Sequence, residues 1–574
     1  MPALSRVLAA LSLLLLSAPV AAKVELNLSG RIQSDLRFRV INERAGQWYS
    51  PIRLDRGVAR NENIGRFRLE ADGGRFFGLA ELDFVWIGLD RDFDTLADLS
   101  LREKNSPYRL EAQALYIEAT DIFVDGLDLR IGQQKVTWGK GDQFNPTNTL
   151  NPLDLEDVLL FGELVANMMV KVDYNFGANW SLSAVLVPVF KPALLPSSAS
   201  LGLVSVERLP WVEDDVRWRI HAERELAKYL GYPTAISATH IVEPETSFKN
   251  MQGALRVAGM IGDHDIALSY YVGRHTIPTP LFNYSRLTND PQCNPLDPND
   301  CIKGLLTTET TLGFPRMQVV GLNMAGQLNL LGWLSSKIKP IGYRIEAGVF
   351  FPQVYTQSLV QEEMDFGFYT QPKGEYDYIN GRRPHVVDST PFAKWVIGLD
   401  YTFNRYFYLN AQWVHGMPDE FGAGDFLSGG KVVRDARPTI SGPTLLACAV
   451  ADAKRGEHCI EEVTRPRLGD YLVLGGDIKL LADKLLLRLF MLLDLNGYTT
   501  ERFDDTVGQR VSQHHSPFSS EGFSAVFFPE LSYNFGFGLE LFAGALFNLG
   551  KSYTKFGDPA SGGSKVFTRA RFSF

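Results

Sequence analysis

The sequence predicts an all-β fold, a transmembrane antiparallel β-barrel of about 18 strands with long extracellular loops. Many segments alternate apolar and polar residues with a period of two, as strands between lipid and water do. Short turns and longer polar segments follow these strands in regular alternation. After residue 22 no run approaches 18 apolar residues, so no transmembrane helix is expected.

The first and last strands carry the alternation most clearly. Within residues 25–39 the odd positions are small, polar or charged, and the even positions are mainly apolar. Residues 564–574 alternate in the same way and end on Phe574. An amphipathic edge strand of a soluble protein has the same pattern, so the prediction depends on its repetition along the chain.

Sixteen further strands are expected between these two. They fall at residues 64–71, 76–89, 109–119, 127–137, 167–176, 182–189, 249–260, 265–274, 316–330, 338–351, 392–403, 406–415, 471–481, 485–496, 522–534 and 537–549. Eight short turns join them in pairs, with nine mostly longer loops between the pairs. An even number of strands, with both termini on the short-turn side, is typical of outer-membrane barrels. No fixed-period repeat suggests a propeller.

The chain divides into a signal peptide and one barrel. Residues 1–22 have a positive start, an apolar stretch and small residues before a cleavage site. Residues 23–574 are expected to form a single outer-membrane β-barrel, with a short helix at 213–231 inside a loop. The expected location is therefore the outer membrane of a Gram-negative bacterium. A formal net charge of −9 argues against nucleic-acid binding.

The four cysteines form two pairs that are close in sequence, each within a polar, turn-rich stretch. In an oxidising compartment these pairs predict two loop disulfides, Cys293–Cys301 and Cys448–Cys459. Metal binding is the weaker interpretation, because no C-x-x-C or histidine pairing accompanies them. No metal site and no cofactor are expected.

One segment breaks the strand pattern and carries the most specific motif. After residue 129 the strand meets Gly139 and Gly141 and then two Asn-Pro pairs, which cannot continue a sheet. Residues 139–160 therefore fold either outward as a loop or inward as a constriction. The apolar side chains that this segment carries favour the inward position.

This segment also carries a family resemblance. Its motif consists of Gly132, Gln133, Trp138, Gly139, Asn145, Pro146, Asn151, Pro152 and Asp154. The motif resembles the G-x-Q…W-G…N-P…N-P-x-D signature of a broad, poorly characterised outer-membrane barrel family that is similar to the alginate-export and phosphate-selective porins. The resemblance implies an 18-stranded channel with a loop constriction, and it implies no particular substrate.

Charged residues on the polar strand faces are candidates for the pore lining. They are Arg31, Arg37, Arg39, Arg66, Arg68, Arg109, Arg130, Arg344, Arg488, Arg569 and Arg571, with Asp35, Glu70, Glu81, Asp83, Glu111, Asp128 and Glu346. In a water-filled lumen such groups form selectivity rings, whereas in a dry one they only pair and stiffen the barrel. The excess of arginine favours anionic solutes.

The expected function is a porin-like channel for hydrophilic, perhaps anionic, solutes or a polysaccharide. The alternative is a plugged barrel that binds periplasmic or surface partners, and a lipid-acting barrel enzyme is a third option. The scattered histidines match no nucleophile or zinc motif, so no enzyme is expected. The other expected partners are outer-membrane lipid and, through Phe574, the barrel-assembly machinery.

Overall fold

The structure of the protein is a computed structural model. It describes residues 24–574 except 45–52, 90–105, 158–161, 178, 196–230, 233, 295–296, 330–338, 366–369, 372, 377–384, 388–389, 423–430, 439–459, 467, 505–508, 552–553 and 559–560.

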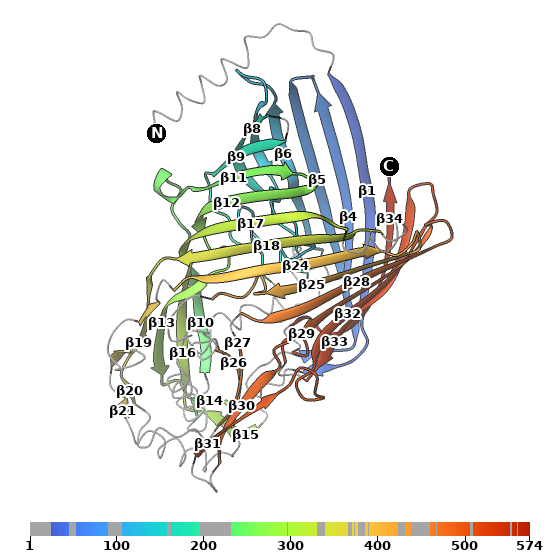
Figure 1. Ribbon diagram of the computed structural model, residues 1–574. Coiled ribbons are helices and arrows are strands. Elements are labelled where there is room, and N and C mark those ends of the chain that lie inside the picture. Colours follow the sequence, from blue (N-terminus) through green and yellow to red (C-terminus); the bar gives the residue numbers. More distant parts are fainter. Residues whose placement is uncertain are drawn as a thin grey trace.

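Eighteen strands form one closed antiparallel ring (Figure 1). Each strand pairs with the next in sequence, and the last pairs with the first, so that Arg569 lies opposite Asp35. In order around the ring the strands are β1 (Glu25–Arg39), β4 (Gly57–Asp72), β5 (Phe76–Leu89), β6 (Tyr108–Ala119), β7 (Leu127–Gln134), β8 (Asn167–Phe176), β9 (Trp180–Val187), β11 (Gln252–Ile261), β12 (His264–Arg274), β17 (Arg316–Leu328), β18 (Ile341–Pro352), β24 (Phe392–Thr402), β25 (Phe407–His415), β28 (Asp470–Leu480), β29 (Leu485–Asp494), β32 (Ser524–Asn534), β33 (Leu539–Gly550) and β34 (Lys565–Ser573). Closure leaves no free sheet edge, which is the condition for crossing a membrane with strands.

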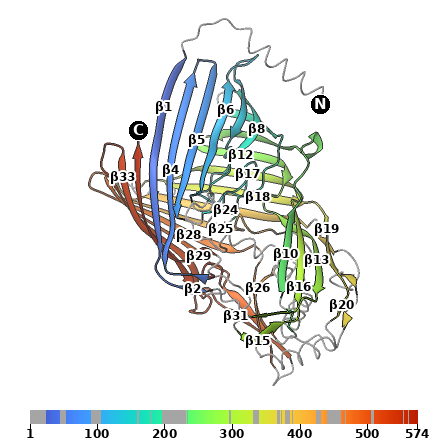
Figure 2. The same cartoon turned by 180° about the vertical axis from the view of Figure 1, so that it is seen from behind.

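The two ends of the ring differ. The first strand begins and the last strand finishes at the end of the ring that carries the short turns. There the backbones of Gly30 and Phe574 exchange two hydrogen bonds of 2.9 and 3.0 Å. The opposite end carries additional strands formed by the long segments (Figures 1 and 2).

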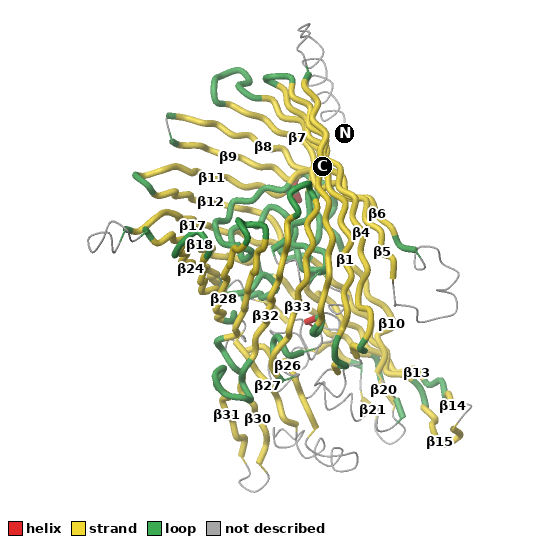
Figure 3. Tube along the Cα trace, turned by 90° about the vertical axis from the view of Figure 1, so that its right-hand side faces the viewer, coloured by secondary structure: helices red, strands yellow, loops and turns green. Residues whose placement is uncertain are grey.

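These additional strands form several smaller sheets. One sheet contains β10 (Thr234–Ile241), β13 (Thr279–Thr288), β16 (Leu305–Gly313), β19 (Tyr355–Gln361), β22 (Gly374–Tyr376) and β23 (His385–Val387); another contains β26 (Lys431–Pro438), β27 (Ile460–Pro466), β30 (Tyr498–Asp504) and β31 (Gln509–His515). Short two-stranded sheets are β2 (Glu43–Arg44) with β3 (Arg53–Leu54), β14 (Gln292–Asn294) with β15 (Asp297–Ile302), and β20 (Met364–Asp365) with β21 (Thr370–Gln371). Figure 3 shows β14, β15, β26, β27, β30 and β31 at the end remote from the termini. The strand alternation did not predict these sheets.

The outer face of the ring is apolar. On β4, Phe67 and Leu69 are exposed, whereas Arg66 and Arg68 point to the opposite face and reach acidic residues of β4 and β5. Exposed apolar side chains recur on the other strands, for example Leu268 on β12 and Leu322 on β17. This alternation is the pattern of a barrel surrounded by lipid. Among the described residues, no helix is long and apolar enough to span a membrane.

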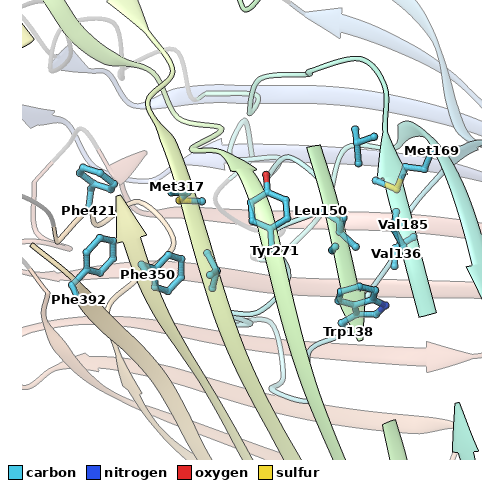
Figure 4. Close-up of a cluster of buried hydrophobic side chains, with 13 residues drawn as sticks. Val136, Trp138, Leu150, Met169, Val185, Tyr271, Met317, Phe350, Phe392 and Phe421 are labelled. Atoms are coloured by element: carbon cyan, nitrogen blue, oxygen red, sulfur yellow. The ribbon is translucent and has the colours of Figure 1, made fainter. Parts of the chain in front are cut away.

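Two apolar clusters lie inside the ring. The first, shown in Figure 4, joins Trp138 and Leu150 to the inner faces of β8, β9, β11, β12, β17, β18 and β24. The second places Phe144 and Phe556 against the inner faces of β24, β25, β28, β29, β32 and β33. Segments between strands therefore occupy part of the lumen.

The predicted all-β, 18-stranded barrel is confirmed, with some strand ends displaced. The strand expected at 127–137 ends at Gln134, because the amide of Val136 donates to the side chain of Asn151 at 2.7 Å instead of to a neighbouring strand. The strand expected to begin at residue 64 begins at Gly57. The predicted helix at 213–231 lies outside the described residues except at Gly231, and so does the signal peptide.

Candidate functional site: the inner segment and the charged lumen wall

Residues 135–157 cross the interior of the ring, and we call them the inner segment. Thr147 contacts Glu346 of β18, and Asp142 receives a 3.0 Å hydrogen bond from Asn410 of β25. At the other end, Asp157 accepts a 2.7 Å hydrogen bond from Arg37 of β1. Since these partners lie on the ring face opposite the exposed apolar one, the segment reaches from one inner wall to another.

Asparagine side chains shape the inner segment. The Oδ1 of Asn148 accepts the amides of Trp138 and Gly139, each at 2.8 Å. Asn151 accepts the amide of Val136 and donates to the carbonyls of Gln134 and Val165, at 3.0 and 2.9 Å. These bonds replace the sheet partners that the segment lacks.

Gly139 is required for this turn by close contact. A Cβ at Gly139 would lie 2.3 Å from the Oδ1 of Asn145, too close for any other residue. The strand has already ended at Gln134, so this glycine allows the close turn inside the inner segment and does not itself end the strand.

Glu346 is the main anchor of the inner segment. Its side chain is fully buried, with 0 % exposure. One carboxylate oxygen accepts the amides of Lys140 and Gly141 at 2.8 and 3.1 Å. The other accepts the amide and the hydroxyl of Thr147, both at 2.8 Å. Four donors thus converge on one carboxylate of the barrel wall.

Ion pairs hold the inner segment on both sides. Arg344 contacts Asp142 of the segment and Asp400 of β24, and Lys140 pairs with Asp265 of β12 at 3.2 Å. On the other wall, Glu156 lies 3.1 Å from Arg60 and 3.3 Å from Arg109. These partly exposed groups of opposite charge help to fix the path of the segment.

Most predicted lumen arginines are paired with acidic residues. The contacts are Arg37 with Asp35 and Asp157, Arg66 with Glu81 and Asp83, Arg68 with Glu70 and Glu81, Arg109 with Glu111 and Glu156, Arg130 with Glu118, Arg344 with Asp142 and Asp400, Arg488 with Asp477, Arg569 with Asp35 and Glu530, and Arg571 with Glu540. Most of these pairs join neighbouring strands or a strand and the inner segment. Asp128 of β7 accepts the backbone amide of Asp121 at 3.1 Å, near the short-turn end. Arg39 of β1 also has a partner, although its Nε is buried without a hydrogen bond.

Burial along this wall is uneven. Arg37 and Asp35 are buried next to the inner segment, at 2 % and 1 % exposure. The side chains of Arg68 and Arg109 are 43 % and 37 % exposed. The charged wall is thus closed to solvent at Arg37 and Asp35 and accessible at Arg68 and at Arg109, which also contacts the segment.

Two arginines on the inner face differ from the rest. Arg31 of β1 and Arg256 of β11 each have a buried Nε without a hydrogen bond, and neither makes an ion pair with another described residue. Sequence reasoning named Arg31 but missed Arg256, although Arg256 lies in a predicted strand with apolar Leu255 and Val257 on either side. The same alternation would have found it.

The motif residues have mainly structural contacts. Gln133 donates to the carbonyl of Ala112 at 2.8 Å, and Trp138 is buried in the first apolar cluster. Asp154 caps the turn by accepting the amide of Glu156 at 3.1 Å, while burial raises the pKa of the Asp154 carboxyl. The Oδ1 of Asn145 is buried without a hydrogen bond. Pro146 and Pro152 follow Asn145 and Asn151 along the inner segment.

A second buried network, which the sequence did not suggest, joins two of the long segments. Glu420 accepts the Nζ of Lys555 at 2.6 Å, the amides of Met417 and Gly469 at 3.0 and 2.8 Å, and the hydroxyl of Tyr471. Although burial alone raises the pKa of Glu420, Lys555 and these hydrogen bonds lower it to about 2. The network ties residues after β25, before β28 and after β33 to one point.

The predicted disulfides are covered only in part. Cys301 is disulfide-bonded, and Cys293 lies opposite it in the register of β14 and β15. Their pairing with each other stays a prediction. Cys448 and Cys459 lie outside the described residues.

Comparisons with known proteins give one family match and several similar solved structures. Residues 4–246 match a family described as "Protein of unknown function (DUF1302)", a range that includes the motif at 132–154. No curated protein matches the sequence. The resemblance to alginate-export and phosphate-selective porins stays a prediction.

Among solved structures, the chain is similar to OccAB1 of Acinetobacter baumannii, at 8 % identity, covering 97 % of this chain and 98 % of that one, with a TM-score of 0.42. It is also similar to the outer membrane channel DcaP of the same organism, at 9 % identity, 97 % and 99 % coverage and a TM-score of 0.33. OccD3 (OpdP) of Pseudomonas aeruginosa is 7 % identical, with 96 % of this chain and 91 % of that one covered and a TM-score of 0.37. These likenesses are too distant to transfer a solute.

Proposed function

We propose that this chain is an outer-membrane channel through which hydrophilic solutes pass passively, anions in preference. The observation that carries the proposal is the partial exposure of charged side chains inside a closed ring, such as Arg68 and Arg109. Water must reach these groups, because full burial of so many charges would be costly. A closed barrel with an apolar exterior and a hydrated charged interior suits a channel.

The inner segment is the proposed constriction. It contacts opposite walls: Glu346 holds residues Lys140, Gly141 and Thr147, and Arg37 holds the end of the segment at Asp157. Because charged residues line its path, it would select solutes by charge as well as by size. The proposal assigns no catalytic residue.

Single-channel recording tests this function. The purified barrel should conduct in a planar bilayer, and shortening residues 139–157 should raise its conductance. A salt gradient should reveal anion preference. A barrel that stays silent after the shortening would contradict the channel.

The second candidate is a plugged barrel that binds partners through its long segments. The two apolar clusters favour it, because they join the inner segment to much of the ring wall. A silent barrel that co-purifies with a periplasmic or surface partner would support this candidate instead.

A further inference from the structure

A polar cavity lies beside the inner segment, on the wall formed by β9, β11, β12 and β17. Its volume is about 190 Å³. The polar groups that line it are Lys140, Asn179, Ser181, Arg256, Asp265 and Asn323. Lys140 comes from the inner segment and the others from the ring and its turns, so the cavity lies where solute would pass the proposed constriction.

Arg256 is the unusual member of this lining. Its guanidinium makes no hydrogen bond and no ion pair to a described residue, and its Nε is buried. The guanidinium carbon lies 5.9 Å from the ring centre of Trp138, a cation–π contact that orients the group without using its N–H donors. A planar set of donors in a cavity, with no protein acceptor, suits a bidentate oxyanion.

The charges around the cavity limit the ligand to a single negative charge. Arg256 and Lys140 are positive, whereas Asp265 is negative and lies 3.2 Å from the Lys140 ammonium. Glu346 does not line the cavity, but its carboxylate keeps its charge, because its four donors are uncharged, and it offsets part of the positive charge at Arg256. Asp173 is paired with Lys171. One excess positive charge in the lining favours a monoanion over a dianion.

The remaining polar groups suit hydroxyls. The cavity presents the hydroxyl of Ser181, the amides of Asn179 and Asn323, and the carboxylate of Asp265. The Lys140 and Asp265 side chains are 37 % and 47 % exposed, so a solute in the lumen can reach them. An engineered cavity of about 150 Å³ holds benzene, so this one admits a small organic molecule.

We infer that this cavity is a binding site for a small hydroxylated monocarboxylate, with Arg256 and Lys140 on the carboxylate and Ser181 and Asn179 on the hydroxyls. The inference rests on the proposed channel, because it names a class of solute that the lumen would hold on its way through. It assigns Arg256 a role in specificity that the paired arginines of the opposite wall do not have.

The test measures binding and not conductance, so its failure differs from failure of the channel. Saturation-transfer NMR on the detergent-solubilised full barrel would titrate D-glycerate, with glycerol as the uncharged probe and tartrate as the dianion. Saturable binding of glycerate, tighter than that of glycerol and of tartrate, is the expected result. Absence of saturable glycerate binding would overturn the inference even if the barrel conducts.

Variants locate the site. Arg256→Gln should weaken glycerate binding at least about tenfold, the effect of losing one charge-assisted contact. Lys140→Gln should also weaken glycerate binding. Because it changes the inner segment and not the ring, it can replace Arg256→Gln in the test if that variant does not fold. Arg405→Gln, in a short turn outside the lumen, is the matched control. If the Arg256 variant binds glycerate as tightly as the Arg405 control does, the site is refuted. If the Arg256 variant does not fold, the same comparison is made with the Lys140 variant.

Discussion

Replacing Glu346 with glutamine should release the inner segment from the barrel wall. The substitution keeps the size of the side chain but turns one acceptor oxygen into an NH2 group. Two of the four donors that meet the carboxylate then lose their acceptor, either Lys140 N and Gly141 N or both groups of Thr147. The new NH2 group also faces their N–H or O–H groups, so the contact becomes repulsive.

The magnitude follows from the burial of this site. A buried donor left without an acceptor costs about 1–3 kcal/mol, so two cost about 2–6 kcal/mol. Removing the buried charge recovers part of this, since the carboxylate no longer has to be kept out of water. A net loss of about 3 kcal/mol would raise the population of the displaced segment by about two orders of magnitude.

Hydrogen exchange measured by mass spectrometry detects this opening directly. Peptides covering residues 139–148 should exchange about a hundredfold faster in Glu346→Gln, while peptides of β1 keep their protection. Glu118→Gln is the control, because Glu118 pairs with Arg130 and does not touch the segment. Equal exchange of the segment in both variants would refute the anchoring role of Glu346, whatever the conductance.

Three further predictions concern the ends of the barrel. Lys555→Met leaves Glu420 buried without its cation and should cost about 3–5 kcal/mol at pH 7. In the folded protein the pKa of Glu420 is lowered from 4.5 to about 2. The stability that its charged form contributes is therefore complete above pH 4.5 and is lost as the pH falls toward 2. The melting temperatures of the wild type and of Lys555→Met should converge across that range. Deleting Phe574, whose backbone helps close the ring, should lower the yield of folded barrel in the membrane, and an unchanged yield would contradict that role. Non-reducing peptide mapping should recover Cys293 linked to Cys301, and free thiols there would show the prediction to be wrong.

The ring itself was predictable from sequence because its physics is local. A strand between lipid and a polar lumen must alternate, so Arg66 and Arg68 alternate with Phe67 and Leu69 whatever their distant neighbours are. The pore-lining role of the candidate arginines stays a prediction. The alternation could not predict the sheets of the long segments, where no lipid imposes a period. The parallel pairing of β10 with β16 is an example, since it joins residues about 70 positions apart.

The candidate site depended on contacts that no local pattern records. Glycine and proline indicated that the strand before the inner segment breaks, but neither its end at Gln134 nor that Glu346, some 200 residues later, would accept the amides of the segment. In sequence, Glu346 and Arg256 look like other charged residues on polar strand faces. Their difference comes from the inner segment, which satisfies one and leaves the other without an acceptor. A lumen charge therefore acquires its role from what crosses the lumen, and in this barrel the same segment that engages Glu346 also forms the cavity beside Arg256.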